Sequence, residues 1–237
     1  MDPAMLLFLP GLICDARTFA PQLAAFPGAR ALDGYGSADS LQAMARAVLT
    51  EADRHGADAL DLFGHSMGGR VALEIVRQAP GRVRRLALVS TGVHPVGRGE
   101  AAKRHALRDL GREQGFPALV DAWLPPMLAP ANRADPTLYD PLRAMCIAQG
   151  QARFEQDIAA LLGRPEAVGL LPSIACPVLV MTGALDGWAP PEQHRDIAAA
   201  IRQAMLVIVP DAGHMLPLEA PAAVNEAIAG WLSHPEQ

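Results

Sequence analysis

The sequence has few cysteines, no long apolar run and no long run of charges of one sign, and each absence excludes a class of protein. The three cysteines are odd in number and far apart, so they predict neither a disulfide framework nor a CxxC metal site. The net charge of −5 is spread along the 237 residues and gives no basic surface for nucleic acid. No apolar run reaches the roughly 18 residues of a membrane-spanning helix. We expect a cytoplasmic, globular protein that binds neither nucleic acid nor membrane.

Short apolar runs alternate with helical stretches, which predicts a mostly parallel sheet with helices on both faces. The first run is too short for a secretory leader, lacks a basic flank and ends at Pro10-Gly11, so we interpret it as a strand. Nearly continuous apolar runs such as Leu86 to Val89 suit strands that are buried on both faces. The expected strands span residues 5–9, 29–33, 59–63, 85–90, 177–182 and 205–210.

Three stretches place apolar residues at helical spacing, namely residues 40–55, 68–79 and 221–232. Ser40 is placed to cap the first of them. Residues 91–171 differ, because glycines and prolines break their helical segments and no strand is evident. A span of this length between consecutive strands favours an inserted, mostly helical cap over a loop. We expect residues 1–90 and 172–237 to form the core and 91–171 the cap.

The most informative motif is the GxSxG pentapeptide from Gly64 to Gly68, which leaves an apolar strand and enters an amphipathic helix. In this context a sharp turn exposes the hydroxyl of Ser66 at the carboxyl end of the strand, where it can act as a nucleophile. Glycines on either side of the serine let the chain double back. The alternative is an ordinary helix N-cap in a glycine-rich turn.

A serine nucleophile needs a base, and the base needs a group that orients it. His214 follows the last expected strand on a glycine-containing turn, and Asp186 follows the strand before it, so both should meet Ser66 at one edge of the sheet. The alternatives are a surface-loop histidine and a capping aspartate. Asp211 lies on the same turn as His214, where reaching back is awkward, and His65 should pack away from the nucleophile.

The negative charge that develops on a carbonyl oxygen during acyl transfer needs N–H donors fixed in advance. The N–H of Met67, directly after the nucleophile, is one candidate. The second is the N–H of Leu12, because Pro10-Gly11 lets the loop after the first strand approach the site. A plain Pro-Gly turn without this role is the alternative.

Four segments together resemble the α/β-hydrolase superfamily, in the order nucleophile, acid, histidine that is typical of it. The resemblance implies a sheet of about six strands without the family's first antiparallel hairpin, because the sequence begins at what would be its third strand. It differs from many members in having Pro10 where they have histidine. The exposed edge would suit a homodimer, and a monomer is equally compatible. The matching segments are residues 9–12, 64–69, 182–186, and 211–214 with 218–221.

The resemblance also implies that residues 91–171 form a cap over the pocket and select the substrate. The expected apolar contacts from this segment are Trp123, Met127, Tyr139 and Met145, together with Leu124, Leu128 and Phe154. Arg143 and Arg153 could bind a substrate carboxylate. Core packing for the apolar residues and solvated helix faces for the arginines are the alternatives.

These features favour a serine hydrolase that cleaves a carboxylic ester or lactone of a small, largely apolar substrate through an acyl-enzyme. No metal or organic cofactor is implied. Carbon–carbon bond hydrolases, thioesterases and perhydrolases use the same triad, and a small-molecule receptor on this fold remains an alternative from another class.

Overall fold

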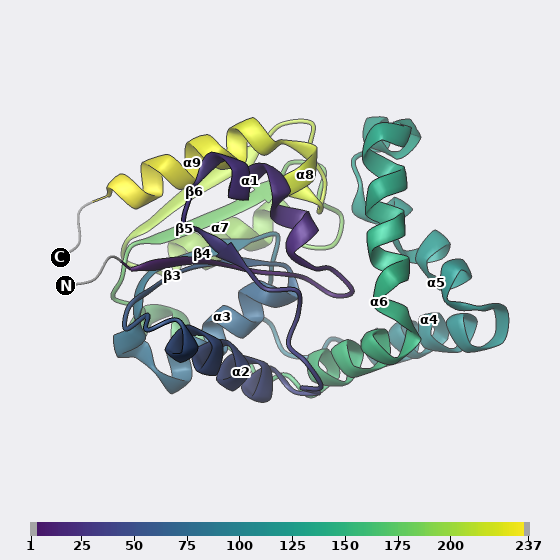
Figure 1. Cartoon of the computed structure of the whole chain (residues 1–237), viewed down its shortest axis with the longest axis horizontal. Helices are drawn as coiled ribbons and strands as arrows, with labels where there is room; N and C mark the ends of the chain where they lie inside the picture. Colours follow the sequence, from purple (N-terminus) through teal and green to yellow (C-terminus); the bar gives the residue numbers. More distant parts are fainter. Residues whose placement is uncertain (1–3, 235–237) are drawn as a thin grey trace.

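The computed structural model describes residues 4–234, and its centre is one sheet of six parallel strands. The strand order is β2-β1-β3-β4-β5-β6, and all neighbouring pairs run parallel (Figure 1). The chain therefore reverses its direction of travel across the sheet after β2, which is the arrangement that brings strand ends together at a crevice. The strands are β1 (Met5–Leu9), β2 (Arg30–Ala31), β3 (Leu60–His65), β4 (Val83–Val89), β5 (Val178–Gly183) and β6 (Ala204–Val209).

The strand predictions are confirmed with shifts of one or two residues at the ends, and β2 differs most. A five-residue strand was expected at 29–33, whereas only Arg30–Ala31 is extended strand. β2 lies at the edge of the sheet, so it pairs with β1 alone, through Leu7↔Arg30 and Phe8↔Ala31. Because β2 is so short, this edge of the sheet exposes few backbone N–H and C=O groups that another strand could pair with.

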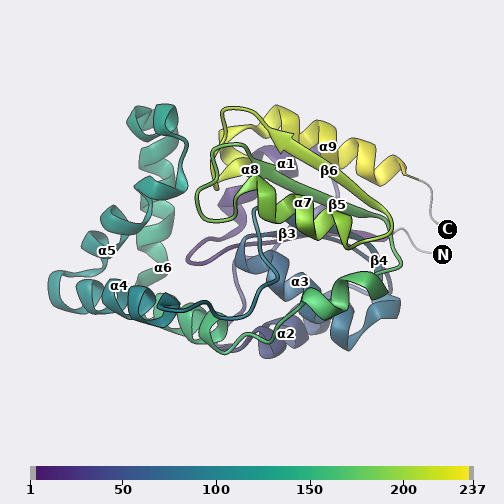
Figure 2. The same ribbon diagram turned by 180° about the vertical axis from the view of Figure 1, so that it is seen from behind.

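Helices cover both faces of the sheet, as the alternation of strand and helix predicts (Figures 1 and 2). Successive strand residues point to opposite faces: Leu6 and Phe8 pack with α9, whereas Leu7 and Leu9 pack with α2 and α3. Two apolar cores result, one on each side of the sheet. The helices of this part are α1 (Ala20–Ala25), α2 (Leu41–Arg54), α3 (Met67–Gln78), α7 (Pro191–Ala199), α8 (Leu216–Glu219) and α9 (Pro221–Ser233).

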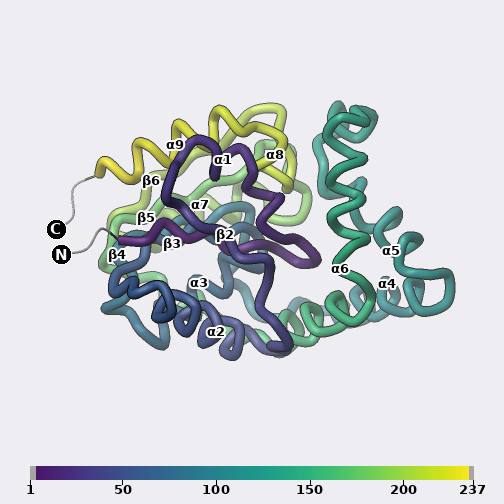
Figure 3. The backbone as a smooth tube through the Cα atoms, in the orientation of Figure 1, coloured from purple at the N-terminus to yellow at the C-terminus, as the bar shows by residue number. Residues whose placement is uncertain are grey.

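Residues 91–171 contain helices and no strand. The helices are α4 (Glu100–Gln114), α5 (Phe116–Trp123) and α6 (Pro136–Leu162), joined by 3-10 turns at Pro125–Met127 and Pro130–Ala134. Gly150 adopts φ 77° and kinks α6, so that its two halves run in different directions. Figure 3 shows this helical group beyond the end of the sheet at which the strands finish. The outermost residues of the expected core, 1–3 and 235–237, lie outside the described part of the chain.

Candidate active site

Ser66 lies at the sharp turn between β3 and α3. Its backbone has φ 55° and ψ −117°, a conformation that is costly for a residue with a side chain. Three hydrogen bonds hold it: its N–H donates to the carbonyl of Val89 (2.8 Å), and its carbonyl accepts from the Gly69 N–H (3.0 Å) and the Thr91 hydroxyl (2.6 Å). This is the strand-turn-helix geometry that the GxSxG motif predicts.

The glycines of the motif are required by close approaches of backbone. A Cβ atom on Gly64 would lie 2.5 Å from the carbonyl oxygen of Gly68, and one on Gly68 would lie 2.1 Å from the carbonyl oxygen of Leu9. Both distances are far below van der Waals contact. Helix α3 therefore starts directly against β3 and the end of β1, which brings Ser66 beside the loop that contains Leu12.

His214 connects Ser66 and Asp186 by hydrogen bonds. Its Nε2 lies 2.8 Å from Ser66 Oγ, and its Nδ1 lies 2.8 and 3.0 Å from the two carboxylate oxygens of Asp186. The Asp186 side chain is fully buried, and that of His214 is 7% exposed. An imidazole held in this way can take a proton from the serine hydroxyl while the carboxylate stabilises the cation that forms.

The carboxylate of Asp186 is kept ionised by its surroundings. Burial alone would raise its pKa, but the charge of His214 and its hydrogen bonds to His214, Trp188 and Ala189 lower the pKa to about 2. The N–H groups of Trp188 and Ala189 donate to Oδ1 across 2.9 and 2.8 Å. Asp211, the alternative acid, is exposed and makes no side-chain hydrogen bond among the described residues.

The loop of His214 is fixed by contacts with both parts of the chain. The His214 N–H donates to the carbonyl of Met127 (2.8 Å), and the His214 carbonyl accepts from Nε2–H of His65 (2.7 Å). His65 is buried, as expected, and burial together with the nearby His214 lowers its pKa to about 4. It therefore stays neutral and supports the loop as a hydrogen-bond donor.

Glu219 also fixes this loop, through four N–H donors. One carboxylate oxygen accepts from the N–H groups of Gly213 (3.1 Å) and Met215 (3.0 Å), on either side of His214. The other accepts from the Ala129 N–H and the Asn132 amide, both at 2.8 Å. The His214 loop is thereby joined to the segment that follows α5.

Leu12 and Met67 both line the cavity beside Ser66. Neither of their N–H groups has a protein acceptor among residues 4–234. The loop of Leu12 is held from two sides, since Tyr35 Oη donates to the carbonyl of Pro10 (2.8 Å) and the Ile13 N–H donates to Asp157 (3.0 Å). Two open N–H donors on rigid backbone beside a serine can bind an oxyanion.

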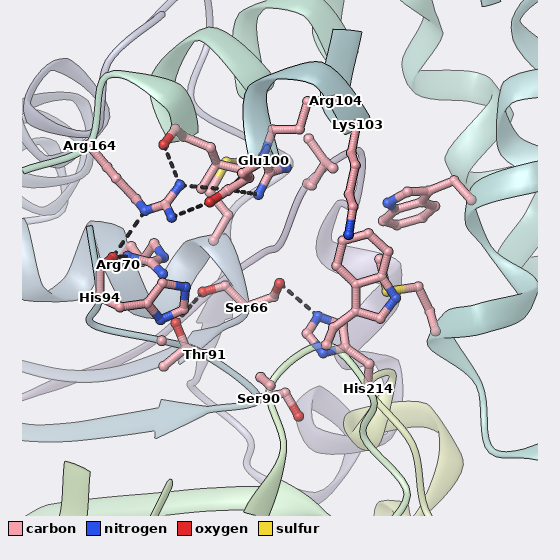
Figure 4. Close-up of a pocket in the computed structure, with 18 of the residues that line it drawn as sticks. Ser66, Arg70, Ser90, Thr91, His94, Glu100, Lys103, Arg104, Arg164 and His214 are labelled. Carbon is pink, nitrogen blue, oxygen red and sulfur yellow. Dashed lines mark hydrogen bonds and ion pairs between the residues drawn. The ribbon is translucent and has the colours of Figure 1, made fainter. Parts of the chain in front are cut away.

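A cavity of about 300 Å³ opens over Ser66 and His214. Figure 4 shows the two side chains facing each other, with Arg70, His94, Glu100 and Arg164 on the other side of the cavity. Its volume suits a small molecule. The apolar part of the lining comprises Leu12, Met67, Leu107, Trp123, Met127, Phe154, Leu161 and Trp188.

Two of the four apolar contacts expected from the helical segment line this cavity, Trp123 and Met127, and two do not. Tyr139 is half-buried on α6 and packs against the core. Met145 is buried, and its sulfur accepts the hydroxyl of Thr18 at 3.6 Å. Phe154, also expected on sequence grounds, does line the cavity. Apolar composition alone could not separate these residues, because the fold determines which faces of α5, α6 and the turn between them point inward.

Neither arginine that was considered for carboxylate binding lines the cavity. Arg143 forms an exposed ion pair with Asp121, with Nε and Nη2 at 2.5 and 2.8 Å from its oxygens. Arg153 donates from Nε to the buried Asp157 (2.9 Å) and lies over the ring of Tyr35. Each of the two guanidinium groups already has a carboxylate partner in the protein.

Several residues that line the cavity were not predicted from the sequence. For Arg70 and Trp188, their distance along the chain from Ser66 and Asp186 could have indicated it. Arg70 lies one helical turn after Ser66, so it shares a face of α3 with it. Trp188 lies two residues after Asp186 and is 46% exposed. His194 does not line the cavity; it is buried on α7 and accepts the N–H of Thr91 at 3.1 Å.

The described residues form neither a membrane-spanning helix nor a metal-binding cluster. No helix within residues 4–234 is long and apolar enough to cross a membrane. The same residues contain no group of three or more histidine, cysteine, aspartate or glutamate side chains that could hold a metal ion. Cys14, Cys146 and Cys176 are free thiols.

Comparison with known proteins identifies the family. Over 90% of its length the chain is 29% identical to the dihydrolipoyllysine-residue acetyltransferase component of the acetoin cleaving system of Pseudomonas putida, of which it covers only 58%. It superposes on an esterase from Thermogutta terrifontis, solved with malate bound, with a TM-score of 0.89 and 26% identity, covering 97% of this chain and 89% of that one. The enol-lactonase from Burkholderia xenovorans LB400 shares the fold, with a TM-score of 0.88 and 22% identity over 99% and 93% of the two chains. The model of the alpha/beta hydrolase family matches residues 5–227, and the chain therefore belongs to that family.

Proposed function

We propose that the protein is a serine hydrolase that cleaves a carboxylic ester or lactone through an acyl-enzyme. The observation that carries this proposal is the continuous chain of hydrogen bonds from Asp186 through His214 to Ser66 Oγ. A hydroxyl with an ordinary pKa is a weak nucleophile, and a base within hydrogen-bond distance overcomes this.

In the first half of the reaction, Ser66 Oγ attacks the carbonyl carbon while His214 Nε2 takes the hydroxyl proton. The N–H groups of Leu12 and Met67 bind the oxygen that becomes negative. His214 then gives its proton to the leaving alkoxide as the carbon–oxygen bond breaks, which leaves the acyl group on Ser66.

In the second half, water attacks the acyl-enzyme and loses a proton to His214. Collapse of the second tetrahedral intermediate breaks the bond to Ser66 Oγ, which recovers the proton, and the acid is released. A lactone follows the same steps, except that the alcohol remains attached to the acyl group and leaves with it.

The known relatives support acyl chemistry at this site. The Thermogutta terrifontis structure is that of an esterase. The Pseudomonas putida relative is named for acetyl transfer, a reaction that also moves an acyl group, although this chain spans only part of it. A carboxylic ester is the substrate class common to the neighbour and to the proposed chemistry.

Labelling with a fluorophosphonate tests the nucleophile directly, because this reagent phosphonylates activated serines. We expect stoichiometric labelling of the wild type and none of Ser66→Ala, together with loss of 4-nitrophenyl acetate hydrolysis. Ser90→Ala is the matched control for labelling, since Ser90 lines the same cavity and its hydroxyl has no partner within residues 4–234. An unlabelled, inactive wild type would overturn the proposal and favour a receptor. A Ser66→Ala variant that keeps full activity would show that Ser66 is not the nucleophile.

A further inference from the structure

One wall of the cavity carries more positive charge than the protein neutralises. Its lining includes five basic side chains and a single carboxylate, which belongs to Glu100. These residues come from three places in the chain: the first turn of α3, the segment from the end of β4 into α4, and the residue just after α6. We call this group the basic wall. The five basic residues are Arg70, Arg98, Lys103, Arg104 and Arg164.

Two of these residues donate hydrogen bonds to the carboxylate of Glu100. Arg164 donates to both carboxylate oxygens, at 2.7 and 2.6 Å, and Arg104 donates to one of them at 2.9 Å. Burial would raise the pKa of Glu100, but the hydrogen bonds from Arg164, the Gly97 N–H and Arg104 hold it well below its usual range. The carboxylate therefore stays ionised and is shared between two guanidinium groups.

Arg164 has further acceptors, so it is bound entirely within the protein. Its side chain is 1% exposed, and it also donates to the carbonyls of His94, Pro95 and Leu161. It belongs to the scaffold of the wall. The residues left to meet a ligand are Arg70, Lys103 and Arg98.

Arg70 is the central feature of the wall, because it is half-buried and has no carboxylate partner among the described residues. Its one hydrogen bond within residues 4–234 runs from Nη1 to the carbonyl of His94, at 3.1 Å. Burial, with the repulsion of Arg164 and Arg104, lowers the pKa of Arg70 to about 9 against the attraction of Glu100. The guanidinium is therefore charged at neutral pH. A half-buried guanidinium without a carboxylate partner in the protein is a favourable position for an anion from outside it.

The backbone beneath Arg70 is shaped to leave it room. A Cβ atom on Gly92 would lie 3.0 Å from Arg70 Nη2, 2.9 Å from His94 and 2.4 Å from the amide nitrogen of Gln193. That amide is anchored, since it donates to the carbonyl of Thr91 at 2.8 Å. The side chains of Arg70, His94 and Gln193 therefore meet over Gly92, which has no side chain of its own.

Lys103 is the second residue of the basic wall that remains available to a ligand. It reaches from α4 into the cavity in Figure 4, and it has no ion-pair partner in the described part of the chain. An exposed, flexible ammonium group and a half-buried guanidinium can both bind a small carboxylate.

We propose that the basic wall is a subsite for a carboxylate on the substrate, so that the preferred substrates are monoanionic esters or lactones rather than neutral ones. This rests on the proposed function, because Ser66 must attack the same molecule. Arg70 follows Ser66 by one helical turn, which is about 5.4 Å along the axis. The carboxylate would therefore lie a few bonds from the scissile carbonyl.

Pairs of substrates that differ only in one carboxylate test this subsite. Mono-4-nitrophenyl adipate and 4-nitrophenyl hexanoate share a six-carbon acyl chain, whereas 4-acetoxybenzoate and phenyl acetate place the difference on the leaving group. The quantity to compare is the ratio of kcat/KM for the anionic ester to kcat/KM for its neutral partner. We expect this ratio to exceed one for at least one pair.

The variants Arg70→Gln and Lys103→Gln should lower this ratio by about ten- to a hundredfold, the usual effect of one charge-assisted contact. Activity on the neutral ester should change far less. Arg195→Gln is the matched control, since Arg195 is an exposed arginine on α7, and it should leave the ratio unchanged. If Arg70→Gln does not fold, Lys103→Gln provides the same comparison, because it also removes one positive charge from the wall.

The subsite is refuted if the wild type prefers the neutral ester in both pairs, or if the ratio is unchanged in Arg70→Gln and Lys103→Gln. Either result is distinguishable from failure of the proposed function. A serine hydrolase without the subsite still hydrolyses 4-nitrophenyl hexanoate and loses that activity in Ser66→Ala, whereas failure of the proposed function leaves no hydrolysis that depends on Ser66.

Discussion

The N–H of Ile13 donates to the buried carboxylate of Asp157 across 3.0 Å, joining two residues that are 144 positions apart. Ile13 adopts φ 46°, which is an unfavourable conformation for a β-branched residue. The peptide of Leu12 lies directly before it. Asp157 on α6 therefore holds the strained loop that presents the proposed oxyanion donor, and the helical segment contributes to the geometry of the site as well as covering it.

Replacing Asp157 by alanine should lower kcat by about ten- to a hundredfold and leave KM nearly unchanged. Complete loss of one oxyanion donor costs roughly a hundred- to a thousandfold in kcat, and a misplaced loop should lose part of that. The variant should also be less stable, because Arg153 loses its carboxylate partner. Steady-state kinetics and urea unfolding measure the two effects.

Asp157→Asn separates positioning from simple loss of stability. It keeps an acceptor for the Ile13 N–H and should recover much of kcat even though the charge is gone. Asp121→Asn removes an aspartate that is paired with Arg143 at the surface, so kcat should remain at the wild-type value. Equal kcat in Asp157→Ala and Asp157→Asn would contradict the positioning role.

Asp186→Asn should lower kcat by about a thousandfold or more, because an amide no longer holds His214 in the required tautomer. Binding of the substrate should be little affected, since Asp186 is fully buried behind His214. Single-turnover kinetics would show slow acylation. A loss of only a few-fold would mean that another group orients the histidine.

The depressed pKa of Asp186, about 2 in the folded protein, predicts how its contribution to stability changes with pH. The unfolded carboxyl titrates near about 3.9, so the folded state favours the ionised form. This stabilisation is present in full above about pH 4 and disappears as the pH falls through about 2. Urea unfolding of the wild type and Asp186→Asn from pH 6 downward should show the difference in unfolding free energy shrinking towards acid pH.

The sheet and the triad geometry could be predicted from the sequence because both depend on local patterns. Apolar runs mark the buried strands, and parallel strands deliver their carboxyl ends to one edge. Ser66, Asp186 and His214 each follow such a run, and they lie within hydrogen-bond distance as this reasoning requires.

The lining of the cavity could not be predicted in the same way. Met145 and Trp123 are equally apolar in the sequence, yet only Trp123 reaches the cavity, because the packing of α5 and α6 decides which side chains turn inward. The importance of Arg70 was also hidden, since its lack of a carboxylate partner depends on Arg104 and Arg164 having taken Glu100. Which charges of the basic wall are neutralised therefore depends on the tertiary structure.

Glu219→Gln should loosen the His214 loop. Either amide orientation replaces one acceptor oxygen by an NH₂ group, so two of the four N–H donors around Glu219 lose their partner. Each unsatisfied donor costs about 1 to 3 kcal/mol if it is buried. We expect a lower melting temperature and a several-fold lower kcat.

Glu226→Gln provides the control for this substitution. Glu226 is exposed on α9, and removal of its charge should alter neither the melting temperature nor kcat appreciably. If Glu219→Gln behaves in the same way, the four hydrogen bonds do not position the histidine, and the contacts of His214 with the carbonyl of Met127 and with His65 must suffice.

Gly68→Ala should be among the most damaging single substitutions in the chain. The added methyl group would lie 2.1 Å from the carbonyl oxygen of Leu9 and 2.9 Å from that of Pro10, and these are backbone atoms of the loop beside Ser66 that cannot swing aside. Either α3 moves away from the sheet or the loop of Leu12 moves, and both disrupt the site.

Gly81→Ala is the control, because it has nothing within 4 Å of its added carbon. Thermal unfolding and kcat of that variant should match the wild type. A Gly68→Ala protein with unchanged kcat would show that the approach of α3 to β1 is looser than these distances require.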